Sequence, residues 1–351
     1  MENMKEKINA INKSGIKVNI MEVCGTHTAA ISRFGLRSLL SSNVNLISGP
    51  GCPVCVTPDM YIDYIYDLSL KKDIIIATYG DMIRVPGSNP KKTLEYAMAL
   101  GANVKMVYSS IDALEIARNN PYKKVVFLGI GFETTSPHTA AALKESIENG
   151  INNFYVLSMH KRIEPVMRAL LEDKELKIDG FLCPGHVAAI IGVKGFEFLD
   201  EYKCNGVITG FEFDEIVNAV YMLVKNIKNG DFRLLNCYDS LVKYEGNLKA
   251  ISIIDEVFEM KEDYWRGMGK IPGSGLKLRS RFKDHDIEML YPIDKNAVCS
   301  NDNGCQCGDV LKGKIKPSEC RLFKKVCTPE NPVGPCMVSA EGSCAAYYKY
   351  I

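Results

Sequence analysis

Short apolar runs rich in β-branched residues alternate with helix-like segments through the first third of the chain. The strand-like runs occupy residues 16–23, 43–49, 73–80 and 103–109. Two of the segments between them open with a cap residue and a proline, in "TPDM" and "SNPKK", which is typical of a helix N-terminus. Because parallel strands need a crossover between them, usually a helix, this alternation predicts β-α-β units and a parallel sheet.

The same alternation starts again at residue 123 and fades after about residue 230. The new strand-like runs are "KKVVFLGIGF", "NNFYVLSMH", "IDGFLCPG" and "CNGVITGF". We therefore predict an α/β protein with two Rossmann-like lobes, each with a parallel sheet, followed by a Cys-rich C-terminal domain. The expected boundaries are 15–118, 119–228 and 229–351. The glycine-rich stretch "RGMGKIPGSGLKLR" in the last part is expected to be a loop packed between the lobes.

Polar, glycine-rich segments follow nearly every predicted strand, among them "CGTHT", "GPGCPVC", "GFETTSP", "SMHKR" and "CPGH". In parallel α/β sheets, ligands bind outside the carboxyl ends of the strands. If the two lobes face each other, the side chains at these strand ends line one cleft. The residues placed there are Cys24, His27, Cys52, Cys55, Glu133, His160, His186 and Glu212.

Cys24 and His27 lie at the first of these strand-to-helix turns. A cysteine at a helix N-terminus has its thiolate favoured by the helix dipole, so Cys24 is expected to be a nucleophile or a metal ligand. The plainer alternative is a small buried cysteine beside a capping or core histidine.

Cys52 and Cys55 form a C-x-x-C motif with prolines and glycines around it, in "GPGCPVCVTP". A zinc knuckle requires a second cysteine pair nearby, and none follows within the next 20 residues. The internal proline and the helix expected beyond it favour a redox-active dithiol, while a rigid turn with two inert thiols remains the alternative. A redox pair predicts Cα atoms under about 7 Å apart and sulfurs that open toward the cleft.

Cysteines accumulate at the C-terminus, which holds seven of the 13 in the chain, and no histidine follows His285. A segment with so little apolar periodicity rarely folds on a hydrophobic core alone, so a bound metal is expected to stabilise it. A site made only of thiolates suits zinc or a [4Fe–4S] cluster. The long irregular gaps favour the [4Fe–4S] cluster. Cys305 and Cys307 form a C-x-C that is interpreted as an adjacent dithiol. The expected cluster ligands are Cys320, Cys327, Cys336 and Cys344.

The charge balance excludes some partners. Lys and Arg number 43, and Asp and Glu number 42, so there is no excess of basic residues for nucleic acid or for membranes. The apolar runs are far shorter than the roughly 18 residues of a membrane span, and the N-terminus has no signal-peptide core. We expect a cytoplasmic protein. Structural disulfides are rare there, so clustered cysteines indicate metal or redox chemistry.

Taken in order, the motifs resemble the HypD family of [NiFe]-hydrogenase maturation factors. They are "CGTHT", "GPGCPVCVTP", "GDMIRVPG", "GFETTSP", "PGHV", "RGMGKIPGSGLKLR" and the terminal "CTPENPVGPCMVSAEGSCAAYYKY". The resemblance runs from about residue 20 to residue 351. It implies a scaffold that works in a stable complex with the small partner HypC. On that scaffold, iron receives two cyanides and one carbon monoxide, with cyanide delivered transiently by HypE and the finished group passed to the hydrogenase large subunit.

The resemblance also implies roles for particular residues. Cys24 would bind the iron under assembly, and Cys52 and Cys55 would be the redox-active dithiol. His27 could orient Cys24 or act as an acid–base group. The four C-terminal cysteines would hold the [4Fe–4S] cluster, and the Fe(CN)2CO group would be bound only transiently.

Two other classes of function remain open from the residues alone. One is a cysteine-dependent thiol enzyme with a structural metal site, in which Cys24 is the nucleophile and His27 the base. The other is a zinc-stabilised interaction module.

Overall fold

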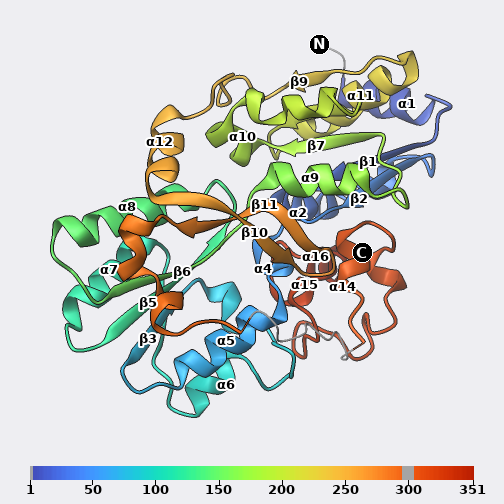
Figure 1. The fold of residues 1–351 in the computed structure, drawn as a ribbon. Coiled ribbons are helices and arrows are strands. Elements are labelled where there is room, and N and C mark those ends of the chain that lie inside the picture. The colour runs from blue at the N-terminus through green and yellow to red at the C-terminus, as the bar shows by residue number, and fades with distance from the viewer. Residues whose placement is uncertain (1–2, 295–303) are drawn as a thin grey trace.

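The computed structural model describes residues 3–294 and 304–351, so Cys299 lies outside the described residues. Two parallel sheets and a two-stranded antiparallel hairpin form the framework, with helices packed around the sheets (Figure 1). The predicted α/β class with parallel sheets is confirmed. No helix in the described parts of the chain has the length and apolar character needed to cross a membrane.

The five-stranded sheet has the order β2-β1-β7-β8-β9 and is parallel throughout. Its strands are β1 (Val18–Glu22), β2 (Val44–Ser48), β7 (Gly180–Pro184), β8 (Asn205–Thr209) and β9 (Leu234–Asn236). Helices pack on it, the longest being α11 (Phe213–Asn229). That helix begins at a capping box formed by Glu212 and Glu215 and ends at Gly230 in the left-handed conformation. The other helices of this half are α1 (Met4–Asn12), α2 (Gly25–Arg33), α3 (Leu36–Leu39), α10 (Gly185–Ile191) and η2 (Val193–Asp200).

The four-stranded sheet has the order β4-β3-β5-β6 and is also parallel. Its strands are β3 (Ile74–Thr78), β4 (Val104–Met106), β5 (Lys124–Gly131) and β6 (Phe154–His160). β5 is buried at every position from Val125 to Gly131, as expected for a strand covered by helices on both faces. The helices of this half are α4 (Pro53–Val56), α5 (Asp59–Ser69), η1 (Gly80–Met82), α6 (Leu94–Ala99), α7 (Ser110–Asn119), α8 (Ser136–Glu148) and α9 (Ile163–Glu172).

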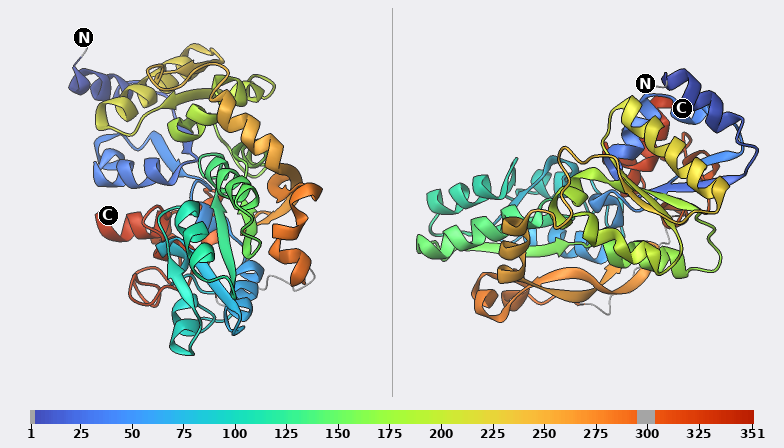
Figure 2. Two further views of the ribbon diagram at one scale, coloured as in Figure 1. Left: turned by 90° about the vertical axis from the view of Figure 1, so that its left-hand side faces the viewer. Right: turned by 90° about the horizontal axis from the view of Figure 1, so that it is seen from above.

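The expected division of the strands between consecutive lobes is wrong. A boundary at residue 118 would cut the four-stranded sheet, because β3 pairs with both β4 and β5. The N-terminal strand β1 instead pairs with β7, with Ile20 opposite Gly180, and β9 adds to the same sheet beyond the expected boundary at 228. The chain therefore starts in one sheet, builds the whole of the other, and returns to complete the first (Figure 2).

The glycine-rich stretch expected to be a loop is instead a strand. It forms β11 (Gly269–Leu278), which pairs with β10 (Phe258–Trp265) in a long antiparallel hairpin. The hairpin lies against β6, where Ser158 Oγ donates a hydrogen bond to Leu276 O over 2.7 Å. Helix α12 (Leu248–Val257) leads into the hairpin, and η3 (Ser280–His285) and α13 (Ile287–Leu290) follow it.

The C-terminal segment 304–351 is made of short helices and turns. It lies beside both sheets, with α16 packed on α2 and α15 packed on α4 (Figure 1). Its elements are α14 (Cys307–Leu311), η4 (Pro317–Glu319), α15 (Pro335–Val338) and α16 (Ser343–Tyr350). One continuous buried core includes Cys55, Trp265 and Cys336, so the C-x-x-C turn, the hairpin and the C-terminal segment share their interior.

Candidate functional site

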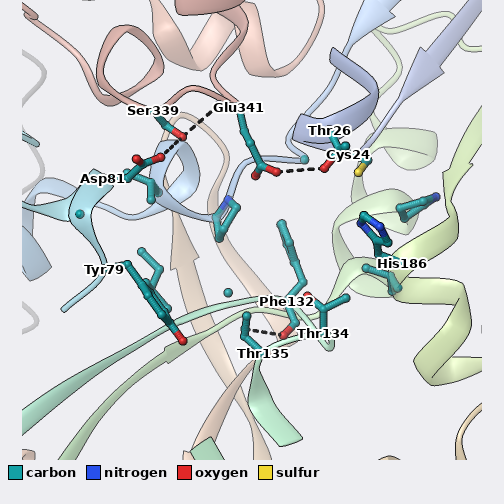
Figure 3. Close-up of a pocket in the computed structure, with 18 of the residues that line it drawn as sticks. Cys24, Thr26, Tyr79, Asp81, Phe132, Thr134, Thr135, His186, Ser339 and Glu341 are labelled. Atoms are coloured by element: carbon teal, nitrogen blue, oxygen red, sulfur yellow. Dashed lines mark hydrogen bonds between the residues drawn. The ribbon is translucent and has the colours of Figure 1, made fainter. Parts of the chain in front are cut away.

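A cleft of about 580 Å³ opens where strands of both sheets end. Its walls come from the segments that follow β1, β2 and β7 in one sheet and β3, β4 and β5 in the other, together with the loop between α15 and α16 (Figure 3). The rule for parallel sheets thus places the site correctly, although the loop from the C-terminus was not expected there. Its polar lining includes Cys24, Thr26, Asp81, His186, Ser339 and Glu341.

Cys24 is the N-cap residue of α2 and reaches the cleft from the carboxyl end of β1, as predicted. It is 9% exposed, and its backbone N–H donates to Glu22 Oε2 over 3.1 Å. Burial raises the pKa of the Cys24 thiol to about 12, even though the backbone N–H groups of His27 and Thr26 act in the opposite direction. The helix N-terminus thus favours the thiolate in the expected direction, but burial outweighs it and the thiol stays protonated. A bound metal cation is what would favour deprotonation of this thiol.

Glu22 lies directly beneath Cys24 and is fully buried. It accepts hydrogen bonds from the Cys24 N–H and from Thr28 Oγ1, the latter over 2.5 Å. Burial raises its pKa to about 7. These contacts fix the backbone at Cys24, so that the thiol faces the cleft.

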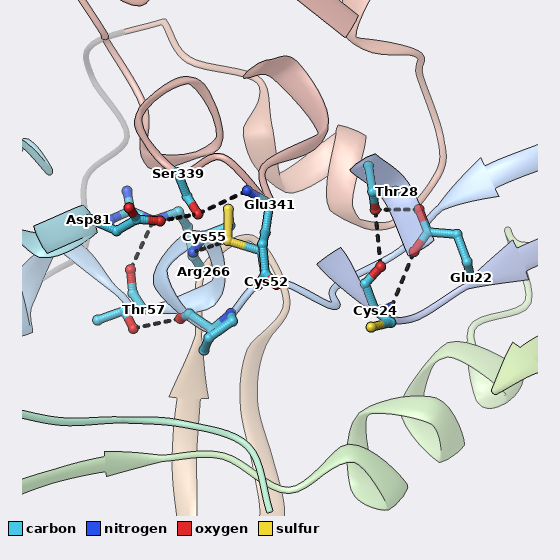
Figure 4. Close-up of a disulfide and its surroundings, with 11 residues drawn as sticks. Glu22, Cys24, Thr28, Cys52, Cys55, Thr57, Asp81, Arg266, Ser339 and Glu341 are labelled. Atoms are coloured by element: carbon cyan, nitrogen blue, oxygen red, sulfur yellow. Dashed lines mark hydrogen bonds between the residues drawn. A yellow bond between two sulfur atoms is a disulfide. The ribbon is translucent and has the colours of Figure 1, made fainter. Parts of the chain in front are cut away.

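Cys52 and Cys55 lie at disulfide distance, with Cα atoms 5.2 Å apart, as the redox interpretation requires (Figure 4). The expectation that their sulfurs open toward the cleft is wrong, since Cys52 is 3% exposed and Cys55 is fully buried. Their neighbours Gly51, Pro53 and Val54 line the cleft instead. The dithiol is therefore behind the cleft wall.

The C-x-x-C turn is joined directly to the Cys24 turn. Gly25 N donates to Gly51 O over 3.1 Å, and a Cβ on Gly51 would lie 2.1 Å from the Cys24 nitrogen. Only glycine permits this approach, so the backbone next to Cys52 and the backbone of Cys24 form one unit.

We expect Gly51→Ala to disrupt this unit, because the new methyl group meets backbone atoms that cannot move aside. Overpacking of this kind costs about 1–3 kcal/mol or more in free energy of unfolding, which chemical denaturation would measure. The matched control is Gly80→Ala in the opposite wall, where the nearest atom is the flexible Met106 sulfur at 3.1 Å. Equal stability of the two variants would contradict the close packing.

His27 points away from the cleft. Its Nε2 lies 2.8 Å from Gly210 O, its ring packs 4.6 Å from Phe211, and it is fully buried. Its Nδ1 has no hydrogen-bond partner among the described residues. Burial lowers its pKa to about 4, so the ring is neutral. The predicted acid–base or orienting role is not supported by these contacts, and His186 is the histidine that lines the cleft.

The other strand-end residues also lie outside the cleft lining. Glu133 is buried and accepts a hydrogen bond from Ile163 N over 3.0 Å, while its neighbours Thr134 and Thr135 line the cleft. His160 is buried with Nε2 3.0 Å from Thr139 Oγ1, and Glu212 caps α11. The strand-end pattern therefore located the correct edge of each sheet but not the side chains that face the opening.

Burial raises the pKa of Glu133 to about 7, and its Oε2 has no hydrogen-bond partner among the described residues. In the folded protein Glu133 therefore stays protonated over a pH range in which the same carboxyl of the unfolded chain has already lost its proton. The free energy of unfolding consequently falls as the pH rises from about 4.5 to 7. We expect Glu133→Gln to be more stable than the parent at pH 8, by up to roughly 3 kcal/mol, and to approach it at pH 5. Denaturation at both pH values checks this, with the exposed Glu148→Gln as control. A pH-independent difference would contradict the buried proton.

Two cleft contacts tie the C-terminal segment to the sheets. Thr26 Oγ1 donates to Glu341 Oε1 over 3.0 Å, and Ser339 Oγ donates to Asp81 Oδ2 over 2.7 Å (Figure 3). A Cβ on Gly25 would lie 2.4 Å from Glu341 Cβ, which shows how closely the segment approaches α2. No role was predicted for these side chains, although the motifs "GDMIRVPG" and "SAEGSC" contain three of them.

A second group of thiols lines a narrow cavity within the C-terminal segment. The side chains of Cys305, Cys307 and Cys336 lie together in its lining, and burial raises the pKa of Cys344. The four expected cluster ligands are thus brought together, and the C-x-C lies with them. The cysteines of this thiol cavity are Cys305, Cys307, Cys320, Cys327, Cys336 and Cys344.

The donor set of the thiol cavity suits a cluster of soft metal ions. Its described lining consists of thiols, one glycine and apolar side chains such as Val310, Phe323 and Met337, with neither imidazole nor carboxylate. Such a set fits iron in a sulfur cluster, in which each thiolate binds a different iron. Across the described residues, no three His, Cys, Asp or Glu side chains surround a single point as the ligands of one ion would.

The fold and site together define a class: an α/β protein that presents one cysteine in a cleft between two parallel sheets and holds further thiols behind it. A family sequence model described as "HypD: Hydrogenase formation hypA family" matches residues 1–351. The chain belongs to the HypD family of hydrogenase maturation factors.

Curated relatives agree over nearly the whole chain. The chain is 43% identical to the hydrogenase maturation factor HypD of Cupriavidus necator, over 98% of this chain and 92% of the relative. It is 42% identical to HypD of Rhodobacter capsulatus, over 95% of this chain and 89% of the relative. It is also 42% identical to HypD of Rhizobium leguminosarum, over 99% and 92% respectively. The resemblance inferred from the motifs is thereby confirmed.

Proposed function

We propose that this protein is the scaffold on which an iron atom receives two cyanides and one carbon monoxide during maturation of a [NiFe]-hydrogenase. It works in the cytoplasm in a stable complex with a HypC-type partner, which supplies a second cysteine to the iron. A HypE-type partner delivers cyanide transiently, and the completed Fe(CN)2CO group passes to the hydrogenase large subunit. Family membership supports the general role, and the cleft supports the place of assembly.

The observation that carries the proposal is the position of Cys24. It is a thiol at the wall of a cleft of about 580 Å³, and the backbone beneath it is fixed by Glu22 and Gly51. A thiolate is a strong ligand for iron that carries cyanide and carbon monoxide. The cleft leaves room for those small ligands and for the partner's cysteine.

Cys52 and Cys55 are proposed to be the redox pair of the scaffold. They are separated from Cys24 only by the Gly51 backbone contact, and they can form a disulfide within their own turn. Iron must be electron-rich to hold cyanide and carbon monoxide, so thiols that can give up electrons are useful at this position.

Cys320, Cys327, Cys336 and Cys344 are proposed to hold a [4Fe–4S] cluster in the thiol cavity. Such a cluster, when bound, supplies or accepts one electron at a time. The role of this chain's own residues is to keep it in a dry cavity beside the C-x-x-C turn, since α15, which carries Cys336, packs on α4, which carries Cys55.

The alternative of a thiol enzyme with Cys24 as nucleophile and His27 as base has less support. A general base must lie within hydrogen-bond reach of the proton that it removes. The Nε2 atom of His27 bonds the Gly210 carbonyl, and its Nδ1 is unpaired among the described residues, so neither nitrogen bonds the Cys24 sulfur.

Complementation tests the proposed function. A host that produces a [NiFe]-hydrogenase but lacks its own HypD should regain hydrogenase activity when it expresses this chain. The Cys24→Ala variant should accumulate to the same level and restore no activity. Restored activity with Cys24→Ala would refute the role of Cys24, and activity without any HypD-family chain would refute the need for the scaffold.

A further inference from the structure

Arg266 lies at the turn between β10 and β11 and is buried, with 5% of its surface exposed. Its contacts are made with the residues that directly follow Cys55. Its backbone N–H donates to Val56 O over 2.8 Å, its Nε donates to Thr57 O over 2.9 Å, and its Nη1 forms an ion pair with Asp59. The hairpin turn therefore holds the end of α4, on which Cys55 is carried (Figure 4).

The other side of the same turn contacts the thiol cavity. A Cβ on Gly267 would lie 2.2 Å from the Cα of Gly308, and one on Gly308 would lie 2.7 Å from the Cα of Gly267. Gly308 directly follows Cys307, which lines the cavity. The two backbones therefore touch, and a movement of one requires a movement of the other.

The buried ion pair adds to this contact. Arg266 and Asp59 are both almost fully buried, so breaking their pair would leave an unpaired charge in the interior. The pair therefore holds the turn against the residues that follow Cys55.

We infer that the Arg266–Gly267 turn is a positioning element that couples the C-x-x-C turn to the thiol cavity and holds Cys55 where it can bond to Cys52. Its contacts preorganise the two thiols for disulfide closure, and any disturbance at the cavity side reaches Cys55 through Gly308. The inference assumes, with the proposed function, that Cys52 and Cys55 form and break a disulfide. The hairpin would then have a role of its own, separate from iron binding and from cyanide transfer.

The property to measure is the thiol–disulfide equilibrium of Cys52 and Cys55. The anaerobically purified full-length chain is equilibrated with reduced and oxidised dithiothreitol, quenched by alkylation and analysed by peptide mass spectrometry. In this exchange the protein disulfide becomes two thiols while dithiothreitol closes to its cyclic disulfide, so two electrons and two protons pass to the protein.

Arg266→Gln removes the ion pair and the Nε contact, so we expect the equilibrium to shift about tenfold toward the dithiol, the effect of roughly 1.4 kcal/mol of lost preorganisation. Arg266→Lys keeps the charge but cannot make both contacts, and should shift it in the same direction by a smaller factor. The matched control is Arg279→Gln directly after the hairpin, where an exposed arginine donates to Asp255 O and no shift is expected.

Gly308→Ala is the decisive variant, because it changes the cavity side and touches neither Cys52 nor Cys55. We expect about a threefold shift toward the dithiol, and less than additive shifts when it is combined with Arg266→Gln, since both act through one turn. An unchanged equilibrium in Gly308→Ala, or additive shifts, would overturn the coupling. Unchanged equilibria in both Arg266 variants would overturn the positioning role. The measurement needs no assembled iron group, so it is decided independently of hydrogenase maturation.

Discussion

Replacing Cys336 by alanine is expected to abolish binding of the proposed iron–sulfur cluster and to destabilise the C-terminal segment. Cys336 is 1% exposed and lines the thiol cavity together with Cys307. Metal binding to such a segment is folding energy on the order of 10 kcal/mol, so loss of the cluster should lower the free energy of unfolding by roughly 5 kcal/mol or more. Iron and sulfide analysis of the anaerobically purified protein, with thermal unfolding, measures both effects.

The matched control for this variant is Cys237→Ala. Cys237 is a half-buried free cysteine outside both the cleft lining and the thiol cavity. It should keep full iron content and a midpoint close to that of the parent. Full iron content in Cys336→Ala would remove this cysteine from the ligand set and would point to Cys305 or Cys307 in its place.

Cys24→Ser is expected to affect only one of the two proposed iron sites. The substitution replaces one sulfur at a surface of the cleft and leaves the backbone contacts of Glu22 and Gly51 in place, so the free energy of unfolding should stay within about 1 kcal/mol of the parent. The cluster iron should remain, because Cys24 is not among the residues that line the thiol cavity. The additional iron acquired in complex with a HypC-type partner should be lost.

Metal analysis of the isolated complex checks this, with Cys237→Ser prepared in the same way as the control. The expected result is a loss of about one iron per complex in Cys24→Ser alone. Loss of the cluster iron as well would show that Cys24 also supports the C-terminal segment. An unchanged iron content would mean that another residue holds the iron under assembly.

The strands were predictable because their signal is local. The runs at 16–23, 123–132 and 152–160 all contain strands of the structure, since apolar β-branched residues between turn signals specify a buried strand by themselves. Their pairing was not predictable in this way. β1 pairs with β7 across about 160 residues, and nothing in either run identifies the other as its partner.

The β10–β11 hairpin was missed for a related reason. Pro272 and the surrounding glycines lower the strand propensity of β11, and the strand is stabilised instead by packing against β6 and by the buried pair of Lys161 and Asp263. A propensity-based interpretation therefore sees a loop where tertiary contacts make a strand.

The candidate site was predictable in location and less so in composition. Cys24 and His186 followed from the position of their strands, but His27 and Glu133 occupy equivalent positions and face the interior. Which side chain of a turn faces the cleft depends on the conformation of that turn. The rule that ligands bind outside the carboxyl ends of parallel strands says nothing about this conformation. Ser339 and Glu341 reach the cleft only because the C-terminal segment folds back onto Asp81 and Thr26.

We propose that Cys24 holds the iron that carries cyanide and carbon monoxide. The most direct measurement is the infrared spectrum of this chain purified without oxygen in complex with a HypC-type partner. We expect absorption bands of iron-bound cyanide and carbon monoxide in the parent complex, and no such bands in a Cys24→Ser complex that still contains its cluster iron. Bands of undiminished intensity in Cys24→Ser would show that another residue holds this iron.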